Sequence, residues 1–346
     1  MLLHQYRLMP TFGLAFFMLF TTTSCEKAPP PPVQLEGMVG TATWHVTINE
    51  PSVALNRQTL TQALDQVLQS TNQTIASWDA TSELSRFNQS SSTDWVTVSP
   101  ELAHLVHLTL QISEQSAGIY DVTVGPLIKL WGFNASGTQQ DHVPSQADID
   151  TARAKVGYHK LQVRLDPPAL RKSQADLKVE LASVADGFAV DQVGKYLESH
   201  GITNYMVEVA GEIRTRGNSS RGDHWRIGIE KPIELGRAVQ QGIHLQKAGL
   251  ATSGDYRNFF TEQGKRYSHT LNPATGYPVQ HRLASVSVIA DDATTADAYA
   301  TTLMAMGEAQ GRTFAEQHHL KAYFIWRTDT GFASYATPQF APAMLP

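Results

Sequence analysis

The sequence predicts an α+β protein, and three observations support this. Segments with helical periodicity and segments with strand alternation are both present, but they do not alternate strictly as in a doubly wound sheet. The chain has 346 residues, of which 42% are hydrophobic and 17% charged, as expected for a globular protein with one large core or two smaller ones. No repeat of fixed period is visible. The net charge of −5 leaves no basic footprint for a nucleic acid.

The N-terminal residues have the pattern of an export signal. Arg7 precedes the apolar run Phe12–Phe20. This run is shorter than the roughly 20 residues that a membrane-spanning helix needs. A basic start and a short apolar centre are typical of a secretory signal peptide, which we place at residues 1–24.

Cys25 is the only cysteine, so it cannot form an internal disulfide. The segment Thr22-Thr23-Ser24-Cys25 resembles a bacterial lipobox, although leucine is usual at the position of Thr22. We therefore expect lipid attachment at Cys25. The alternative is ordinary cleavage nearby, with Cys25 unmodified. Residues 25–36 are expected to form a linker that contains the proline run Ala28–Pro32.

A single domain is expected over residues 37–340, followed by a tail at 341–346. The segment Thr43–Ile48 alternates as a strand does, and Arg57–Ser77 has helical periodicity. Ser99 and Pro100 are typical of a helix start, for a helix that ends near Ser116. A further helix is predicted from about Gly187 to Gly201. The remaining predictions are a helix at Thr295–Met306 and strands at Tyr205–Val209, Trp225–Glu230, Gly242–Leu245, Ala284–Ala290 and Ala322–Trp326.

Three distant segments combine turn formers, hydroxyls and charged groups. The densest runs from Ser253 to Pro278, and the others are Gly118–Phe133 and Glu180–Asp191. An ordinary surface hairpin needs only one or two such residues. We expect the three segments to converge on one site that holds a large phosphorylated ligand.

Asp297 and Thr301 lie four residues apart on a predicted helix, so they share a face. A carboxylate and a hydroxyl are hard oxygen donors of the kind that Mg²⁺ prefers. The alternative is a solvated helix edge. In Glu180–Asp191, small residues allow a ligand to approach the backbone, and phosphates favour helix N-termini. Asp186 there is equally well explained as a helix cap.

The aromatic residues Tyr120, Trp131 and Phe133 follow a tight turn. Most such residues are core residues, but a planar ring system also needs aromatic faces on which to stack.

Taken together, the motifs resemble those of the ApbE family of flavin transferases, in family order across roughly residues 38–307. They are Ser82–Asn88, Tyr120–Leu127 with Leu130–Phe133, Asp186–Asp191, Glu208–Ile213, Ala251–Arg257, Tyr267–Pro278, and Thr295–Ala298 with Thr301. This sequence departs from the usual family pattern at Trp78, Glu180, Asp186 and Ala210.

The resemblance implies a T-fold-related α+β domain with FAD and Mg²⁺ in a cleft. It also implies transfer of FMN from FAD to a Ser or Thr hydroxyl of a partner protein, with release of AMP. The implied metal ligands are Asp297, Thr301 and the backbone carbonyl of Ser183. The implied FAD contacts are Met38, Trp78, Ile119, Tyr120, Asp121, Glu180, Asp186, His269, Thr270 and Leu271.

For the chemistry, a hydroxyl nucleophile benefits from a base, and His269 is the candidate because imidazole titrates near neutrality. The alternative is that His269 hydrogen-bonds the flavin or its ribityl chain. Asp297 is expected to act through the metal, while Asp255 and Arg257 organise their loop. The alternative for Arg257 is that it faces a phosphate. Asp292–Thr295 faintly resembles the acceptor sequence that the family modifies, but we interpret it as a helix start.

Two other functions remain open: a Mg²⁺-dependent FAD pyrophosphatase with water as the attacking group, and a non-catalytic flavin-binding lipoprotein. The resemblance further suggests acceptors among subunits of the Na⁺-translocating NADH:quinone reductase or the Rnf complex. It is consistent with a protein that is exported to the periplasmic side and lipid-anchored to a membrane, with the inner membrane as the expected location.

Overall fold

The structure is a computed structural model that describes residues 31–50, 56–133, 142–233, 236–256 and 258–346. The predicted signal peptide, Cys25 and Arg257 lie outside the described residues. In the part of the chain that is described, no helix is both long enough and apolar enough to cross a membrane.

Helices and strands are mixed along the chain, as predicted for an α+β fold. The helices are α1 (Arg57–Ile75), α2 (Glu83–Gln89), α3 (Pro100–Gln115), α4 (Gly125–Leu130), α5 (Gln146–Arg153), α6 (Ala182–Ser199) and α7 (Ala293–Gln317), with short 3₁₀ turns at Tyr158–Lys160 and Ala341–Ala343. The strands are β1 (Val33–Val39), β2 (Ala42–Ile48), β3 (Val96–Thr97), β4 (Leu161–Leu165), β5 (Pro168–Lys172), β6 (Tyr205–Val209), β7 (Glu212–Arg216), β8 (Trp225–Glu230), β9 (Val239–Leu245), β10 (Ala248–Gly254), β11 (Phe259–Glu262), β12 (Lys265–Ser268), β13 (Leu283–Ala290), β14 (Lys321–Thr328) and β15 (Gly331–Ala336).

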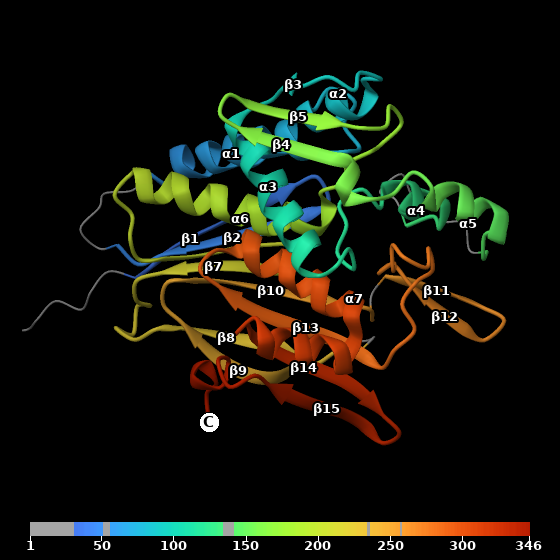
Figure 1. The fold of residues 1–346 in the computed structure, drawn as a ribbon. Coiled ribbons are helices and arrows are strands. Elements are labelled where there is room, and N and C mark those ends of the chain that lie inside the picture. The colour runs from blue at the N-terminus through green and yellow to red at the C-terminus, as the bar shows by residue number, and fades with distance from the viewer. Residues whose placement is uncertain (1–30, 51–55, 134–141, 234–235, 257) are drawn as a thin grey trace, which may run out of the picture. The chain divides into compact units, whose positions relative to one another are not determined.

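An eight-stranded antiparallel sheet organises residues 31–346. Its order is β1-β2-β6-β7-β10-β13-β14-β15. Helices α1, α6 and α7 cover one face, and the β8–β9 hairpin packs on the other face near β14 (Figure 1). The central strands are therefore buried on both sides, which explains why β13 is apolar along most of its length.

Alternate side chains of the central strands enter different cores. Ala251, Val288 and Phe324 pack with α7 on the helical face. Leu250 and Ile289, one residue away in the sequence, pack with the β8–β9 hairpin on the opposite face. This period-two alternation fixes the register of β10 and therefore the place where that strand ends, at Gly254.

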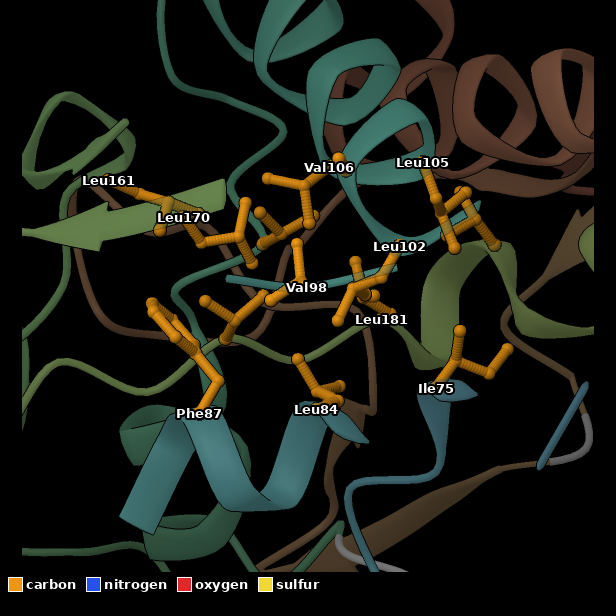
Figure 2. Close-up of a cluster of buried hydrophobic side chains, with 14 of the residues drawn as sticks. Ile75, Leu84, Phe87, Val98, Leu102, Leu105, Val106, Leu161, Leu170 and Leu181 are labelled. Carbon is orange, nitrogen blue, oxygen red and sulfur yellow. The ribbon is translucent and has the colours of Figure 1, made fainter. Parts of the chain in front are cut away.

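A separate apolar cluster holds the start of α6. Figure 2 shows Leu84 of α2, Leu102 and Val106 of α3, and Leu170 of β5 pointing toward a common centre, with Leu181 beside them. Leu181 is fully buried and directly precedes α6. The cluster therefore anchors the first turn of this helix.

Helices α4 and α5 pack with the β11–β12 hairpin in another cluster, around Trp131, Phe260 and Leu271. The indole N–H of Trp131 donates to the carbonyl of Gly276 at 2.8 Å. This bond ties α4 to the turn at residues 272–278. Helices α4 and α5 and the β11–β12 hairpin together form a unit beside the main sheet, which we call the lobe (Figure 1). The predicted binding segment around His269 belongs to this lobe.

Several predicted boundaries need correction. Helix α6 begins at Ala182, five residues before the predicted Gly187. Strand β1 begins at Val33, so residues 33–36 form a strand and are not part of the linker. The predicted tail packs on β9, where Met344 pairs with Ile243. By contrast, the predicted helix end at Met306 is followed directly by Gly307, where α7 is broken by a φ of 77°.

Helices α6 and α7 approach each other unusually closely at Gly187. A Cβ atom there would lie 2.5 Å from the carbonyl oxygen of Ala293 and 2.9 Å from the Cβ of Asp297. Because the atoms of Ala293 in this contact belong to the backbone, a side chain at position 187 would have to displace one of the two helices. The absence of a side chain at Gly187 allows α7 to begin against α6.

Gly187→Ala should therefore lower the free energy of unfolding by about 1–3 kcal/mol, because the added methyl forces the two helices apart. Urea denaturation measures this change. Gly125→Ala is the matched control, since its added Cβ would meet only ordinary contacts, the nearest 3.5 Å away at Glu180. Equal stability of the two variants would contradict the close-packing interpretation.

Candidate active site

Asp297 and Thr301 lie on α7 and face neighbouring elements of the protein. The carboxylate of Asp297 accepts a hydrogen bond from the backbone N–H of Gly187 at 3.2 Å, and this residue is only 8% exposed. The hydroxyl of Thr301 lies 3.2 Å from that of Ser253, at the end of β10. The alternative of a solvated helix edge is therefore wrong for Asp297.

The Gly118–Phe133 segment reaches the first turn of α6 through Tyr120. Its phenol oxygen lies 3.0 Å from the hydroxyl of Ser183, and Tyr120 is 3% exposed. Burial raises the pKa of Tyr120, and the nearby charge of Asp297 raises it further. The phenol therefore stays protonated and can donate a hydrogen bond near neutral pH.

Glu180 links α6 to the end of α1. Its carboxylate accepts from the hydroxyl of Ser77 at 2.7 Å and from the backbone N–H of Ala182 at 3.0 Å. The second bond satisfies one of the free N–H groups at the start of α6. Next to Ser77, Trp78 is 58% exposed, and Met38 is 65% exposed. Both of these predicted FAD contacts present apolar surface to solvent.

The carboxylate of Asp121 is already committed to the protein. It accepts from the N–H of Thr123 at 2.8 Å, from the hydroxyl of Thr123 at 2.6 Å and from the N–H of Tyr158 at 2.8 Å. This carboxylate fixes the loop that carries Ile119 and Tyr120. A FAD contact at Asp121 remains a prediction, and it fits the backbone of this residue better than its side chain.

A cavity of about 400 Å³ lies beside this loop. Its lining includes Gly118, Asp121, Pro273 and Ala274. These residues belong to two of the three segments that were predicted to converge on one site. Neither Asp297 nor His269 lines the cavity.

His269 follows the β11–β12 hairpin and is held by Asn258. Its Nδ1 lies 3.1 Å from the carbonyl oxygen of Asn258. A carbonyl only accepts, so Nδ1 carries the proton and Nε2 keeps a free lone pair. Burial lowers the pKa of His269, and the charge of Asp255 partly opposes this effect. The imidazole is therefore neutral and has the tautomer of a base at Nε2.

The structure does not join His269 directly to the α7 residues. Within the described ranges, no hydrogen bond or ion pair links His269 with Asp297 or Thr301. The ring of Phe133 instead approaches His269 edge-on, with the centroids 6.5 Å apart. Thr270 and Leu271 are both buried, and Leu271 packs in the lobe core. Their predicted contacts with FAD would have to use the backbone.

Buried carboxyl groups accumulate near the start of α7. Burial raises the pKa of Asp186 to about 6, with a contribution from the charge of Glu208. Burial also raises the pKa of Asp297, as does the charge of Asp186. The pKa of Glu212 is raised by burial and by the charges of the other two carboxylates. Each of these acids therefore opposes the ionisation of its neighbours.

The chemistry of these groups fits a cation that is shared with a ligand. Over the described residues, no salt bridge pairs Asp186, Glu212 or Asp297 with a lysine or arginine. In the same ranges, no cluster of three His, Cys, Asp or Glu side chains is placed to hold a metal ion by itself. Mg²⁺ commonly takes only one or two protein carboxylates and completes its octahedron with water and phosphate oxygens. One buried carboxylate and one hydroxyl are therefore suitable donors for a phosphate-bound Mg²⁺.

Sequence reasoning assigned no role to Glu212 or Asp191. Glu212 is 8% exposed at the start of β7. The signal available in the sequence was the acidic residue Glu212, which interrupts the apolar alternation of the paired strands β6 and β7. Asp191 accepts from the N–H groups of Ala293 and Thr294, at 3.1 and 2.8 Å, and pairs with Arg214 at 2.7 Å. The side chain of Asp191, on α6, therefore caps the N-terminus of α7.

The acceptor-like segment Asp292–Thr295 is confirmed as a helix start. The carboxylate of Asp292 accepts from the N–H of Thr295 at 2.7 Å, as an N-cap does. The hydroxyl of Thr294 is buried and donates to Asp191 at 2.5 Å. This hydroxyl is therefore not available to be modified with FMN.

The raised pKa of Asp186 predicts a pH-dependent stability. Between about pH 4 and pH 6 the folded protein retains a proton that the unfolded chain has lost, so stability falls as the pH rises. In metal-free protein, Asp186→Asn should be more stable than wild type at pH 7.5 by up to about 3 kcal/mol. This gain should vanish near pH 4.

Urea denaturation at both pH values measures the effect. The exposed Asp150 serves as the control, and Asp150→Asn should change stability by less than about 0.5 kcal/mol at either pH. A pH-independent gain for Asp186→Asn would contradict the assignment.

Comparisons with known proteins find similar chains that share one name. A protein of Vibrio cholerae serotype O1 named FAD:protein FMN transferase is 39% identical over 330 residues, which are 95% of this chain and 97% of that protein. A Haemophilus influenzae protein of the same name is 36% identical over 332 residues, 94% and 95% of the two chains.

Solved structures agree in fold. The flavin transferase ApbE from Vibrio cholerae superposes with a TM-score of 0.82 at 39% identity, covering 90% of this chain and 99% of that one. The apo flavinyl transferase ApbE from Pseudomonas stutzeri gives 0.82 at 33% identity, covering 90% and 96%. The model of the ApbE family matches residues 40–324. With this match over most of its length, the chain belongs to the ApbE family.

Proposed function

We propose that this protein is an enzyme that transfers FMN from FAD to a hydroxyl group of a partner protein and releases AMP. The names of its relatives support flavin transfer. The observation that carries the proposal is the meeting of Asp297 and Thr301 with the start of α6 and the end of β10, at 3.2 Å in each case. Segments that are distant in the sequence thus meet here: α7 supplies a carboxylate and a hydroxyl, β10 supplies a second hydroxyl, and α6 supplies a backbone N–H.

Different residues would bind the different parts of FAD and the metal ion. The exposed faces of Trp78 and Met38 suit the planar flavin ring. The protonated phenol of Tyr120 is a donor for phosphate or ribityl oxygens. The residues that would hold Mg²⁺ are Asp297 through its carboxylate, Thr301 through its hydroxyl and Ser183 through its carbonyl. Bound there, the ion would offset the charge that develops on the pyrophosphate.

The reaction is a displacement at the FMN-side phosphorus of FAD. The acceptor hydroxyl oxygen forms a new bond to this phosphorus, and the bond from phosphorus to the AMP oxygen breaks. AMP leaves with the electron pair of the broken bond. The hydroxyl proton passes to Nε2 of His269, which is the free nitrogen when Nδ1 donates to Asn258. In this role the bond from Nδ1 to Asn258 would leave Nε2 free to accept the proton.

We further propose that the acceptor is a Ser or Thr of an exported flavoprotein subunit, of the Na⁺-translocating NADH:quinone reductase or Rnf type. Arg7, the apolar run Phe12–Phe20 and Cys25 support export to the periplasmic side and anchoring by lipid. An anchored transferase would meet such acceptors at the membrane surface.

Asp297→Ala should abolish Mg²⁺-dependent transfer, because it removes the only carboxylate among the proposed metal ligands. The assay combines FAD, Mg²⁺ and an acceptor peptide, and mass spectrometry scores the FMN-modified peptide. Release of free FMN in place of modified peptide would identify the wild-type protein as a pyrophosphatase. Asp291→Ala, at an exposed position shortly before α7, is the control. Normal turnover by Asp297→Ala would remove this residue from the metal site.

His269→Ala should retain FAD binding and slow transfer by about 10²-fold or more if Nε2 is the base. Transfer rates at saturating FAD, together with flavin fluorescence titrations, separate the two effects. A defect limited to FAD affinity would make His269 a binding residue.

A further inference from the structure

Asp255 lies at a junction between two parts of the structure. Its backbone N–H donates to the carbonyl of Ala284 at 3.1 Å, which holds it to the start of β13. Its carboxylate accepts two bonds from the guanidinium of Arg327, at 2.7 and 2.9 Å. Its carbonyl accepts from Arg266 at 2.6 Å. Asp255 is 7% exposed, so these contacts replace most of its solvent.

The two arginines come from different structural units. Arg327 lies on β14 of the main sheet, and its N–H donates to the carbonyl of Arg282 at 2.9 Å. Arg266 lies on β12 of the hairpin, and its guanidinium stacks 3.5 Å from the ring centroid of Phe259 on β11. Asp255 therefore connects the sheet to the hairpin through both its side chain and its backbone.

Proposed active-site residues flank this junction on both sides. Two residues before Asp255, Ser253 contacts the hydroxyl of Thr301 at 3.2 Å. Three residues after it, the carbonyl of Asn258 accepts from both the Nδ1 and the backbone N–H of His269, at 3.1 and 3.2 Å. A displacement of Asp255 would therefore change the position of His269 relative to the α7 residues.

We propose that Arg327 is a positioning residue for the transfer reaction: through its two bonds to Asp255, it fixes the hairpin and His269 relative to Thr301 and Asp297. This inference rests on the proposed function of the site. The fork of two parallel N–H donors is what matters, because a bidentate guanidinium restricts both distance and orientation, whereas a lysine ammonium is a single point of charge. Arg327 lies outside residues 40–324, over which the family model matches.

Arg327→Gln removes the charge and one arm of the fork. We expect transfer to slow by about 10- to 100-fold, because small misplacements of reacting groups have effects of this size. We also expect hydrogen exchange to rise at least about 10-fold at the hairpin amides of residues 259–268, with the amides of β13 and α7 unchanged. Arg327→Lys should recover only part of the transfer rate.

Asp255→Asn tests the other end of the same contact. If Arg327 acts through Asp255, then Asp255→Asn with Arg327→Gln should be no slower than the worse single variant. Arg282→Gln is the matched control, since Arg282 is also an arginine at this end of the sheet, and its side chain makes an exposed 3.6 Å pair with Asp329. The substitution keeps the backbone carbonyl that accepts from Arg327. It should leave both the transfer rate and the exchange of the hairpin unchanged.

Three results would overturn the proposal: wild-type transfer by Arg327→Gln, unchanged exchange at the hairpin, or a uniform rise in exchange across β13, α7 and the hairpin, which indicates a general loss of stability. Hydrogen exchange does not depend on turnover. If the wild-type protein transfers no flavin, the proposed function fails, while the exchange measurement still decides whether Arg327 holds the hairpin.

Discussion

The close contact between α6 and α7 is the constraint on which the rest of the site depends. It requires a residue without a side chain at Gly187, because the carbonyl of Ala293 occupies the space of a Cβ atom. It also requires Asp191 on α6 to cap the N–H groups of Ala293 and Thr294 on α7. Arg214 balances this buried carboxylate. With α7 held in this way, the carboxylate of Asp297 faces α6 and accepts from the backbone N–H of Gly187.

The same contact explains the unusual electrostatics. Asp191 is paired with an arginine and caps a helix, so its charge is compensated within the protein. Asp186, Glu212 and Asp297 have no such partner among the described residues, and burial raises the pKa of each. Burying three neighbouring carboxyl groups without a basic partner destabilises the folded protein when they ionise, so stability alone does not explain their presence. A ligand that brings positive charge removes the cost, which is consistent with a cation carried on a pyrophosphate.

Local patterns in the sequence predicted those features that depend on neighbours in the chain. The spacing of Asp297 and Thr301 placed both on one helical face, and alternation located β6 at Tyr205–Val209. The start of α6 was placed too late, because Leu181 offers no side-chain cap and the helix instead begins where a tertiary cluster buries that leucine. Periodicity contains no information on such packing.

The site residues that were missed share a long-range cause. Glu212 accepts a hydrogen bond from the backbone of Thr252 on β10. Arg327 pairs with Asp255, in the loop that follows β10, so both have partners far away in the chain. Asp121 was predicted as a ligand contact, but its carboxylate is used by Tyr158, a residue that no local pattern links to it. In each case the partners of the side chain are brought to it by the tertiary fold. The spacing of residues along the chain therefore does not predict these contacts.

The division into a large sheet and a separately packed lobe also bears on how such an enzyme can act on a protein. The proposed metal ligands Asp297 and Thr301 lie on α7, which is packed against β10 and β13. His269, by contrast, follows a two-stranded hairpin that has its own small core. On the proposed function, one dinucleotide has to meet both α7 and His269, so the separation of the two has to be fixed. The bonds of Asp255 to Arg327 and to Arg266 contribute to this, because they tie the hairpin to the sheet.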